Sequence, residues 1–526
     1  MKILVADSVP DNIIEILKAD PSWEVVNLPK TKGKVAEEIH DADALLVRSA
    51  TKVTAELLDK AKNLKAIGRA GVGVDNVDLD AATRKGVLVM NTPGGNAISV
   101  AEHTLALLLA MAHPVTRADA SMKAGKWEKK KLLGSELRDK TLGLIGLGTI
   151  GTEVARLAQA HKMTVVAFDP YVSPLLATEQ NISLLPLEDV LKTSDYISLH
   201  CSLTPETNHL INAKNLALTK KGVRIVNCAR GELVDESALL AAIESGQVAG
   251  AGLDVFETEP PADPRLINLP AVIATPHIAG STEEAQNVVG TRIAEQLRNY
   301  LVTGAVKNAV NMPSISPEEF KKLDPYVQLG EKLGTFVAQL ADKPISEVSI
   351  SYDGGLADLN THLVKNAVLK GVLSQILAEQ INLINAGSYA KARGIEVVEV
   401  RSGRRAAYSN SLGVALRTGG ESVSVLGMIG LNNVLRVLGV NNIDIEAPLK
   451  GFLLVIRNQD IPGVIGRVGT LLGQHKINIA NFALGRVQNS DEAIGIVNVD
   501  QKVSPEVLAE LRAIQAVRQA RVIEIG

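Results

Sequence analysis

The stretch 141–151, Thr-Leu-Gly-Leu-Ile-Gly-Leu-Gly-Thr-Ile-Gly, decides the fold of this chain. Strand-like residues lead into a G-x-G-x-x-G turn, a helix-like run follows at 152–160, and a second apolar run, 164–168, ends in Asp169. This order of strand, glycine turn, helix and strand, with an acid at the strand tip, is typical of dinucleotide-binding folds. The stretch therefore predicts a βαβ unit that holds a dinucleotide.

Each residue of the turn has a physical task. Gly146 allows the tight turn, Gly148 lets a pyrophosphate approach the backbone, and Gly151 lets the helix pack closely on the strand. The helix N-terminus, at Thr149 and Ile150, offers free N–H groups and a positive dipole end to the phosphates. The turn is therefore predicted to hold the pyrophosphate.

The acid at the strand tip indicates which dinucleotide binds. Asp169 would accept hydrogen bonds from the adenosine ribose hydroxyls and would repel a 2′-phosphate, and no Arg follows it at 170–172. NAD is therefore favoured over NADP. A competing glycine pair, 71–73, also follows an apolar run, but it lacks a third glycine in register and a good helix start. We interpret it as a substrate-side loop, with Val72 beside the cofactor.

Composition limits the kinds of partner. The chain has 526 residues, of which 46% are hydrophobic and 3% aromatic, and a net charge of -3. At about 150 residues per domain, this length predicts roughly three or four domains. The charge favours neither nucleic acid nor an anionic membrane. The two cysteines, Cys201 and Cys228, form no C-x-x-C pattern, so neither a disulfide framework nor a metal site is expected.

The longest apolar stretch, 105–112, is too short to span a bilayer. The chain opens on a strand-like run at 2–7, which leaves no room for a signal peptide. We therefore expect a cytoplasmic protein.

Strand-like and helix-like runs alternate over 1–98 and again over 141–276. This alternation predicts an α/β protein with two doubly wound parallel sheets, a flavodoxin-like substrate lobe and a Rossmann NAD lobe. A proline-bearing segment, 311–317, is interpreted as a linker. Strands and a long helix at 361–386 then predict an α+β intervening domain, and the order β-α-β-β-α-β predicts a ferredoxin-like last domain. The predicted division is 1–98 with 284–316 for the substrate-binding domain, 99–283 for the NAD-binding domain, 317–449 for the intervening domain and 450–526 for the last domain.

Three segments that follow strands of the NAD lobe carry reactive side chains. They contain Arg230 in Asn-Cys-Ala-Arg-Gly, Glu259 in Phe-Glu-Thr-Glu-Pro and His277 in Pro-His-Ile-Ala-Gly. Hydride transfer from an alcohol needs a base for the hydroxyl proton, and His titrates in the right range. A carboxylate on the other ring nitrogen fixes the tautomer, and a guanidinium holds a substrate carboxylate. These three side chains are therefore predicted to be catalytic.

In this order the motifs resemble the D-isomer-specific 2-hydroxyacid dehydrogenases. The segments 47–53, 68–76 and 125–128 are similar to the long-form branch of that family, which ends in an ACT domain. That branch oxidises D-3-phosphoglycerate to 3-phosphohydroxypyruvate with NAD, the first step of L-serine biosynthesis. The resemblance covers essentially the whole chain, and it implies the same three catalytic residues.

Further residues are predicted to line the two binding sites. Around the glycine turn, the cofactor site would include Val72, Asp169, Cys201, Cys228, Ala229, Arg230, Asp254, His277, Ala279 and Gly280. Arg48 and Arg69 end strands of the opposing lobe and are predicted, with Ser49, to contact the substrate. In similar enzymes the segment around Lys129 reaches the neighbouring subunit's substrate; the alternative here is a solvated basic run.

The last domain looks like an ACT effector module. Asp460 is predicted to hold the α-ammonium group of L-serine, with Asn458 and Asn478 completing the site across a domain pair, so a homo-oligomer is expected. An ACT domain that binds no ligand is the alternative. For the whole protein, the alternatives are a D-2-hydroxyacid dehydrogenase for glyoxylate, hydroxypyruvate or 2-oxoglutarate, and a non-catalytic NAD-sensing protein.

Overall fold

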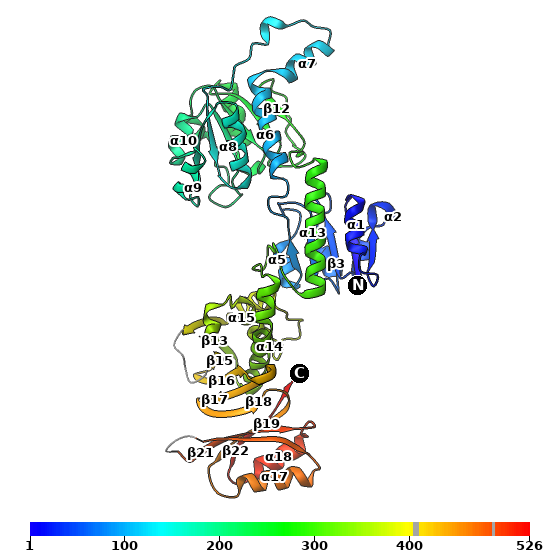
Figure 1. The fold of residues 1–526 in the computed structure, drawn as a ribbon, viewed down its shortest axis with the longest axis vertical. Helices are drawn as coiled ribbons and strands as arrows, with labels where there is room; N and C mark the ends of the chain where they lie inside the picture. Colours follow the sequence, from blue (N-terminus) through cyan, green and yellow to red (C-terminus); the bar gives the residue numbers. More distant parts are fainter. Residues whose placement is uncertain (403–409, 487–489) are drawn as a thin grey trace.

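Four β-sheets lie one after another along the long axis of the protein (Figure 1). The structure, a computed structural model, describes residues 1–402, 410–486 and 490–526. The sheet that contains the glycine turn is at the top of Figure 1, the N-terminal sheet is next, and the sheet of the last domain is at the bottom. The predicted α/β class, with two further smaller units, is confirmed.

The N-terminal sheet is parallel throughout, in the order β2-β1-β3-β4-β5. This is the flavodoxin-like order. Its strands are β1 (Lys2–Val5), β2 (Glu24–Asn27), β3 (Ala44–Val47), β4 (Ala66–Arg69) and β5 (Leu88–Met90). The central strand β3 is buried along its whole length, which is why it is apolar at every position. The helices include α1 (Asp11–Lys18), α4 (Ala55–Lys60) and α5 (Leu79–Arg84).

One helix of this lobe comes from much later in the chain. Helix α13 (Glu283–Thr303) packs on the N-terminal sheet, where a Cβ atom at Gly68 would meet the side chains of Leu297 and Ile293. A Cβ atom at Gly290 would meet Ile13 of α1. This packing supports the proposed division, in which the chain leaves the substrate lobe, forms the NAD lobe and returns.

The second sheet is also parallel and has the order β12-β11-β10-β9-β6-β7-β8. Its strands are β6 (Thr141–Ile145), β7 (Thr164–Phe168), β8 (Ser183–Leu184), β9 (Tyr196–Leu199), β10 (Val223–Asn227), β11 (Val248–Leu253) and β12 (Val272–Ala274). Helices α6 (Ala97–Ala112), α8 (Thr149–Ala160), α9 (Pro174–Glu179), α10 (Leu187–Thr193), α11 (Ala213–Ala217) and α12 (Glu236–Glu244) surround it. The order reverses between β6 and β9, where ligands bind in such sheets.

Helix α7 (Val115–Lys123) and the short turn η2 (Lys129–Lys131) stand away from this sheet at one end of the molecule (Figure 1). Among the described residues, no single helix has the length and apolar composition that a membrane crossing requires. Helices α6 and α7 satisfy both conditions only as a pair, and they are bent by 67° to one another.

The third sheet is mixed, in the order β14-β13-β15-β16-β17-β18. Its strands are β13 (Ile345–Gly354), β14 (Glu396–Ser402), β15 (Asn410–Thr418), β16 (Glu421–Ile429), β17 (Leu435–Val440) and β18 (Ile443–Pro448). The long helix α14 (Pro317–Leu340) is not among the elements expected from the sequence, and it begins at Pro317, the last residue of the segment interpreted as a linker. Ser316 and Glu319 form a capping box with a proline at the first helical position, which starts a helix.

The proline-bearing segment lies between α13 and α14 and is anchored to the first lobe, because the side chain of Asn311 accepts from Val89 N on β5 at 2.9 Å and donates to the carbonyl oxygen of Val87, just before β5, at 2.9 Å. One sequence prediction for this region was wrong. The predicted helix 361–386 ends early: α15 (His362–Leu373) covers its first half, and α16 (Ala386–Ala392) begins only at its last residue. Between them, the side chains of Asn382 and Asn385 accept from nearby backbone N–H groups and so replace the helical hydrogen bonds.

The last sheet is antiparallel, in the order β20-β21-β19-β22. Its elements are β19 (Gly451–Gln459), α17 (Val464–Gln474), β20 (Ile479–Arg486), β21 (Glu492–Val499), α18 (Pro505–Ala513) and β22 (Val517–Ile525). This is the predicted β-α-β-β-α-β order. The sequence pattern places the end of the second strand of this order at Val487, which lies outside the described residues.

Candidate active site

A cavity of about 650 Å³ lies between the carboxyl ends of the first two sheets. It is lined by loops that follow β3 and β4 on one side and β9, β10, β11 and β12 on the other. It brings together most of the predicted cofactor and substrate residues: Arg48, Ser49, Arg69, Val72, Ile150, Cys201, Cys228, Ala229, Arg230, Asp254, Glu259, His277, Ala279 and Gly280. The glycine pair at 71–73 lies in this wall, as its interpretation as a substrate-side loop required.

The histidine and the glutamate form a pair. Nδ1 of His277 lies 2.8 Å from Oε2 of Glu259. The other carboxylate oxygen of Glu259 accepts from Phe256 N at 3.2 Å, which fixes the orientation of the carboxylate. An ionised carboxylate can only accept, so Nδ1 of His277 carries the hydrogen and Nε2 keeps a free lone pair. The pair can therefore take a proton at Nε2.

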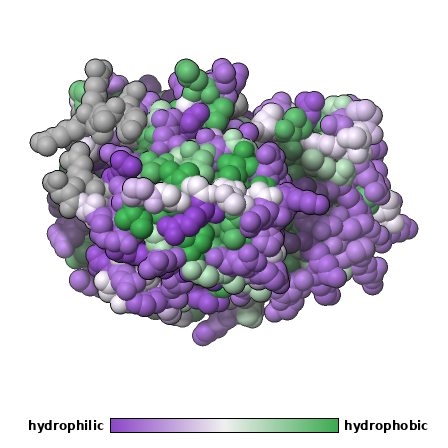
Figure 2. Space-filling model, turned by 90° about the horizontal axis from the view of Figure 1, so that it is seen from below, coloured by the Kyte–Doolittle hydropathy of each residue, from purple (hydrophilic) through white to green (hydrophobic). Residues whose placement is uncertain are grey.

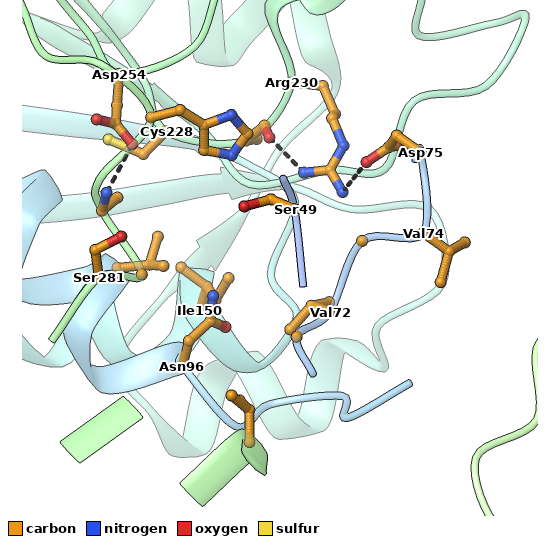
Figure 3. Close-up of a pocket in the computed structure, with 18 of the residues that line it drawn as sticks. Ser49, Val72, Val74, Asp75, Asn96, Ile150, Cys228, Arg230, Asp254 and Ser281 are labelled. Atoms are coloured by element: carbon orange, nitrogen blue, oxygen red, sulfur yellow. Dashed lines mark hydrogen bonds and ion pairs between the residues drawn. The ribbon is translucent and has the colours of Figure 1, made fainter. Parts of the chain in front are cut away.

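The guanidinium of Arg230 lines the same cavity. Asn227 is buried at the end of β10, accepts from Ala229 N at 3.0 Å and donates to Arg230 O at 2.7 Å, so it fixes the turn that carries Arg230. The guanidinium is 3.0 Å from Asp75 of the facing loop, and Figure 3 shows it pointing toward Asp75 beside Ser49. A Cβ atom at Gly73 would lie 2.1 Å from this guanidinium. Only glycine at 73 therefore allows this close approach.

The cations of the first lobe are held by residues that the sequence did not single out. Buried Asp7 accepts from Arg48 N at 2.6 Å and from the Thr51 hydroxyl at 2.6 Å. Asn76 donates to the carbonyl oxygens of Arg48 and Thr51, both at 2.7 Å. These bonds shape the loop that carries Arg48 and Ser49.

Arg69 is a buried cation whose charge lies near those of Arg230 and Arg48. Burial lowers the pKa of its guanidinium, and the charge of Arg230, with a smaller effect from Arg48, lowers it further. Its Nε is buried and has no hydrogen-bond partner among the described residues. The same holds for the buried Oδ1 of Asn96, which is also in the cavity wall. Buried polar atoms almost always have a hydrogen-bond partner, so both atoms indicate that a bound ligand supplies the missing partners.

The glycine turn has the shape that a pyrophosphate needs. Gly146 has a φ of +96°, and a Cβ atom at Gly151 would lie 2.3 Å from Gly146 O. These two glycines are required by the protein itself. Gly148, in contrast, has no atom within 4 Å of an added Cβ. The space in front of Gly148 is therefore open for a ligand, and the residues present fit a dinucleotide.

Asp169 is fixed at the tip of β7. One carboxylate oxygen accepts from Leu147 N at 2.8 Å, and the other accepts from Tyr171 N at 2.9 Å and Val172 N at 3.2 Å. A carboxylate has about four lone-pair sites, so roughly one is left for a ligand hydroxyl.

The thiols and a histidine of the cavity wall are uncharged. Burial raises the pKa of Cys228 to about 12 and also raises the pKa of Cys201. Both thiols therefore stay protonated, in agreement with their interpretation as lining residues. His200, which no sequence motif indicated, follows β9, and its Nε2 lies 2.8 Å from the Ser198 hydroxyl. Burial lowers its pKa to about 4, so it is neutral at pH 7. Its only signal was its position at a strand end.

Comparison with known proteins tests the predicted family. Residues 105–279 match the family described as D-isomer specific 2-hydroxyacid dehydrogenase, NAD binding domain. Residues 322–441 match the D-3-phosphoglycerate dehydrogenase intervening domain, and residues 452–516 match the ACT domain. The chain is 43% identical to the D-3-phosphoglycerate dehydrogenase of Methanocaldococcus jannaschii over 526 residues, which is 100% of both chains. It is 40% identical to that of Bacillus subtilis, over 100% of this chain and 99% of the relative.

The chain belongs to the D-3-phosphoglycerate dehydrogenase family. Among solved structures it is similar to D-lactate dehydrogenase from Aquifex aeolicus complexed with NAD and lactic acid, at 32% identity and a TM-score of 0.51, over 60% of this chain and 100% of that one. A glyoxylate reductase from Paecilomyes thermophila is 31% identical with a TM-score of 0.53, over 59% of this chain and 98% of that one. The predictions of the family and of an NAD-dependent oxidoreductase are confirmed.

Some predicted residues do not line the cavity of this D-3-phosphoglycerate dehydrogenase family member: from the cofactor site, Gly146, Gly148, Thr149, Gly151 and Asp169, and two further groups. Lys129 is on η2, beyond α7, and a single copy does not bring it to the cavity. In the ACT domain, Asp460 lies 3.2 Å from Arg486 at the end of β20, whereas Asn478 precedes the start of β20 and bonds Asp500 at 2.6 Å. Asn458 is buried near the end of β19 and is paired with Ala493 of β21. Ala493 is paired on its other side with Arg486, so Asn458 lies at the Arg486 end of β20. A single copy therefore does not bring Asn478 to Asn458 and Asp460.

Proposed function

We propose that the protein oxidises D-3-phosphoglycerate to 3-phosphohydroxypyruvate with NAD, the first step of L-serine biosynthesis. The observation that carries the proposal is a single cavity with the His277–Glu259 pair and three guanidinium groups, those of Arg48, Arg69 and Arg230. The pair supplies a base for the hydroxyl proton, and the guanidinium groups supply the charge for an anionic substrate. Full-length relatives carry the name of this activity.

His277 acts as the base in this proposal. Its Nε2 takes the proton of the substrate hydroxyl while bound NAD provides the hydride acceptor. Glu259 accepts from Nδ1 and stabilises the imidazolium that forms. Arg230, fixed by Asn227, binds the substrate carboxylate and polarises the nascent carbonyl. The hydroxyl proton of the substrate is therefore transferred to a residue of the NAD lobe.

The charge of the cavity favours a phosphorylated substrate. A phosphate monoester adds about −1.5 to −2 at pH 7 to the −1 of a carboxylate, so the substrate carries about −3. The repulsion among the guanidinium groups that lowers the pKa of Arg69 is relieved by such an anion. We assign the phosphate to Arg48 and Arg69, with Ser49 as a hydroxyl donor. A hydroxy acid without phosphate would leave these cations unpaired.

Initial rates on a panel of 2-hydroxy acids test the substrate. We expect D-3-phosphoglycerate to be preferred over D-glycerate, D-lactate and D-2-hydroxyglutarate. Arg69→Ala should raise KM for D-3-phosphoglycerate far more than KM for D-glycerate, and Arg156→Ala, an exposed arginine paired with Glu153, should change neither. Faster turnover of an unphosphorylated acid by the wild type, or equal losses on both substrates in Arg69→Ala, would contradict the assignment.

We also propose that the ACT domain binds L-serine between two copies of the chain. Asp460 would hold the ammonium group beside Asn458, and Asn478 would come from the second copy. Strand β20 has 8 residues, and at about 3.3 Å per residue it separates the two ends by roughly 25 Å within one copy. The face seen in Figure 2 has an apolar patch among hydrophilic residues, and Ile461 and Ile465 are exposed in this domain. The protein would therefore be a homo-oligomer.

A serine titration of activity, together with calorimetric binding, tests this site. Coupling of about 1–3 kcal/mol would change the apparent activity by about 5–150-fold. Asp460→Ala should abolish both binding and inhibition, and Glu506→Ala on the exposed side of α18 should leave both intact. Absence of serine binding to the wild type would leave an ACT domain without this ligand.

We propose a cytoplasmic location, with small molecules as partners and neither nucleic acid nor membrane. The free thiols of Cys201 and Cys228 support a reducing compartment. Among the described residues, no group of three or more His, Cys, Asp or Glu side chains could hold a metal ion, and the proposed chemistry uses none.

A further inference from the structure

The loop that carries His277 is held by one buried carboxylate. Asp254, which has no exposed surface, accepts through its side chain from Ile278 N at 2.9 Å and from Ala279 N at 2.8 Å. Its backbone oxygen accepts from His277 N at 2.8 Å. The backbone N–H groups of three successive residues, 277–279, thus donate to Asp254.

This loop needs to be held because its conformation is unfavourable. His277 has a φ of +53°, in the left-handed region that residues with a side chain seldom adopt. Such a conformation persists only where the surrounding structure fixes it. The position of the His277 ring against Glu259 therefore depends on the bonds made by Asp254.

The hydroxyl of Thr275 links Asp254 to a residue on another element. Oγ1 of Thr275 lies 2.6 Å from Oδ1 of Asp254, and its single hydrogen must point there because a carboxylate only accepts. Nε2 of His103 lies 3.0 Å from the same hydroxyl oxygen. Since the hydroxyl hydrogen is already used, Nε2 of His103 must carry a hydrogen and donate it. The hydrogen bonds therefore run in one direction, from His103 through Thr275 to Asp254.

The position of His103 suits this task. It lies on α6, which packs against β11 and β12, the strands that lead to Asp254 and Thr275. Its Nε2 is also 3.6 Å from Oδ1 of Asp254, and its side chain is only 20% exposed. It is not among the residues that line the cavity, so it acts only through its neighbours.

We infer that His103 is a positioning residue of the active site, which orients the Thr275 hydroxyl toward Asp254 and thereby holds the His277 loop in its left-handed conformation. The inference rests on the proposed role of His277 as the base. Without the N–H of His103, the Thr275 hydroxyl loses the donor that fixes its rotation, and Asp254 loses a directed hydrogen bond. The His277 ring then occupies its reactive position for a smaller fraction of the time.

Matched substitutions at His103 test the inference in the full-length protein. His103→Leu removes the donor, whereas the amide of His103→Gln can donate to the same hydroxyl. We expect His103→Leu to lower kcat about tenfold, the scale of a small misplacement of a catalytic group. KM and the calorimetric Kd for NAD should change little, and His103→Gln should restore most of kcat. His161→Leu, whose exposed ring bonds only its own helix at Leu157 O, should match the wild type.

Substitutions at Thr275 test the same link independently of whether His103→Leu folds. Thr275→Val removes the hydroxyl and should lower kcat as His103→Leu does, and Thr275→Ser keeps the hydroxyl and should retain kcat. The double variant His103→Leu/Thr275→Val should be no slower than Thr275→Val, because both changes break one chain of bonds.

Three results would overturn the inference: wild-type kcat in His103→Leu or in Thr275→Val, equal losses in His103→Leu and His103→Gln, or effects that multiply in the double variant. His277→Ala, measured in parallel, separates this failure from that of the proposed function. If His277→Ala turns over normally, the assignment of the base is wrong, whatever His103 does.

Discussion

Replacing Gly73 with alanine should reduce catalysis while the fold stays intact. The added Cβ atom would lie 2.1 Å from Nη2 of Arg230 and 2.7 Å from Oδ2 of Asp75, whereas ordinary contact begins at 3.4 Å. Both atoms are ends of flexible side chains, and Gly73 does not have a positive φ, so the backbone need not change. The guanidinium of Arg230 must therefore retreat by about 1 Å, and a misplacement of that size can cost about 100-fold in rate.

The expected loss in kcat/KM for D-3-phosphoglycerate is therefore about 10–100-fold, which corresponds to about 1.4–2.7 kcal/mol of transition-state stabilisation. The assay is the initial rate of NADH formation at saturating NAD, with thermal unfolding and the Kd for NAD measured on the same samples. Gly469→Ala is the control, because a Cβ atom there, within α17, has no neighbour within 4 Å. Unchanged kcat/KM in Gly73→Ala would refute the placement of Arg230 against the substrate.

Three further changes have clear expected outcomes. His277→Ala should lower kcat by about 10²–10⁴, the usual contribution of a general base, while NAD still binds in calorimetry; near-normal turnover would remove His277 from the mechanism. The wild type should prefer NAD over NADP by at least about tenfold in kcat/KM, and Asp169→Ala should shrink this ratio; an unchanged ratio would show that Asp169 does not select the cofactor. Burial lowers the pKa of His200 from 6.5 to about 4, so as the pH drops the imidazole is protonated in the unfolded chain before it is protonated in the folded one. The free energy of unfolding should therefore fall by up to about 3 kcal/mol between pH 6.5 and pH 4. Denaturant unfolding of the wild type and His200→Asn across this range checks the sign, since the variant should lose less.

Much of the site could be predicted because its residues belong to short local patterns at strand ends. Arg230, Glu259 and His277 each follow a strand of the parallel sheet, and the carboxyl ends of parallel strands meet at one edge of the sheet. Asp7 and Asn76 could not be predicted in the same way. Their bonds to the Arg48 loop join residues that are far apart in the sequence, and no local pattern records such a contact.

The intervening domain was harder to predict for a related reason. Pro317 stands at the start of α14 and Pro325 lies inside it, so neither ends the helix. The side chains of Asn382 and Asn385 end a helical pattern that composition alone would continue. The same two side chains donate to the carbonyl oxygens of Gly86 and Arg84 at the end of α5. A loop whose conformation is fixed by contacts with another domain shows no hydrophobic periodicity in its own sequence.

The return of the chain at α13 has a consequence for synthesis on the ribosome. The N-terminal sheet is complete at β5, but the residues that cover one face of it, Ile293 and Leu297, belong to α13. At about 5–20 residues per second, α13 leaves the ribosome about 10–40 s after β5. During that interval the nascent chain exposes an apolar sheet face around Gly68, whereas the elements of the NAD lobe are contiguous and can fold as they emerge. The lobe that is synthesised first is therefore the second to fold, and its open face is the part of the nascent chain that a chaperone would bind.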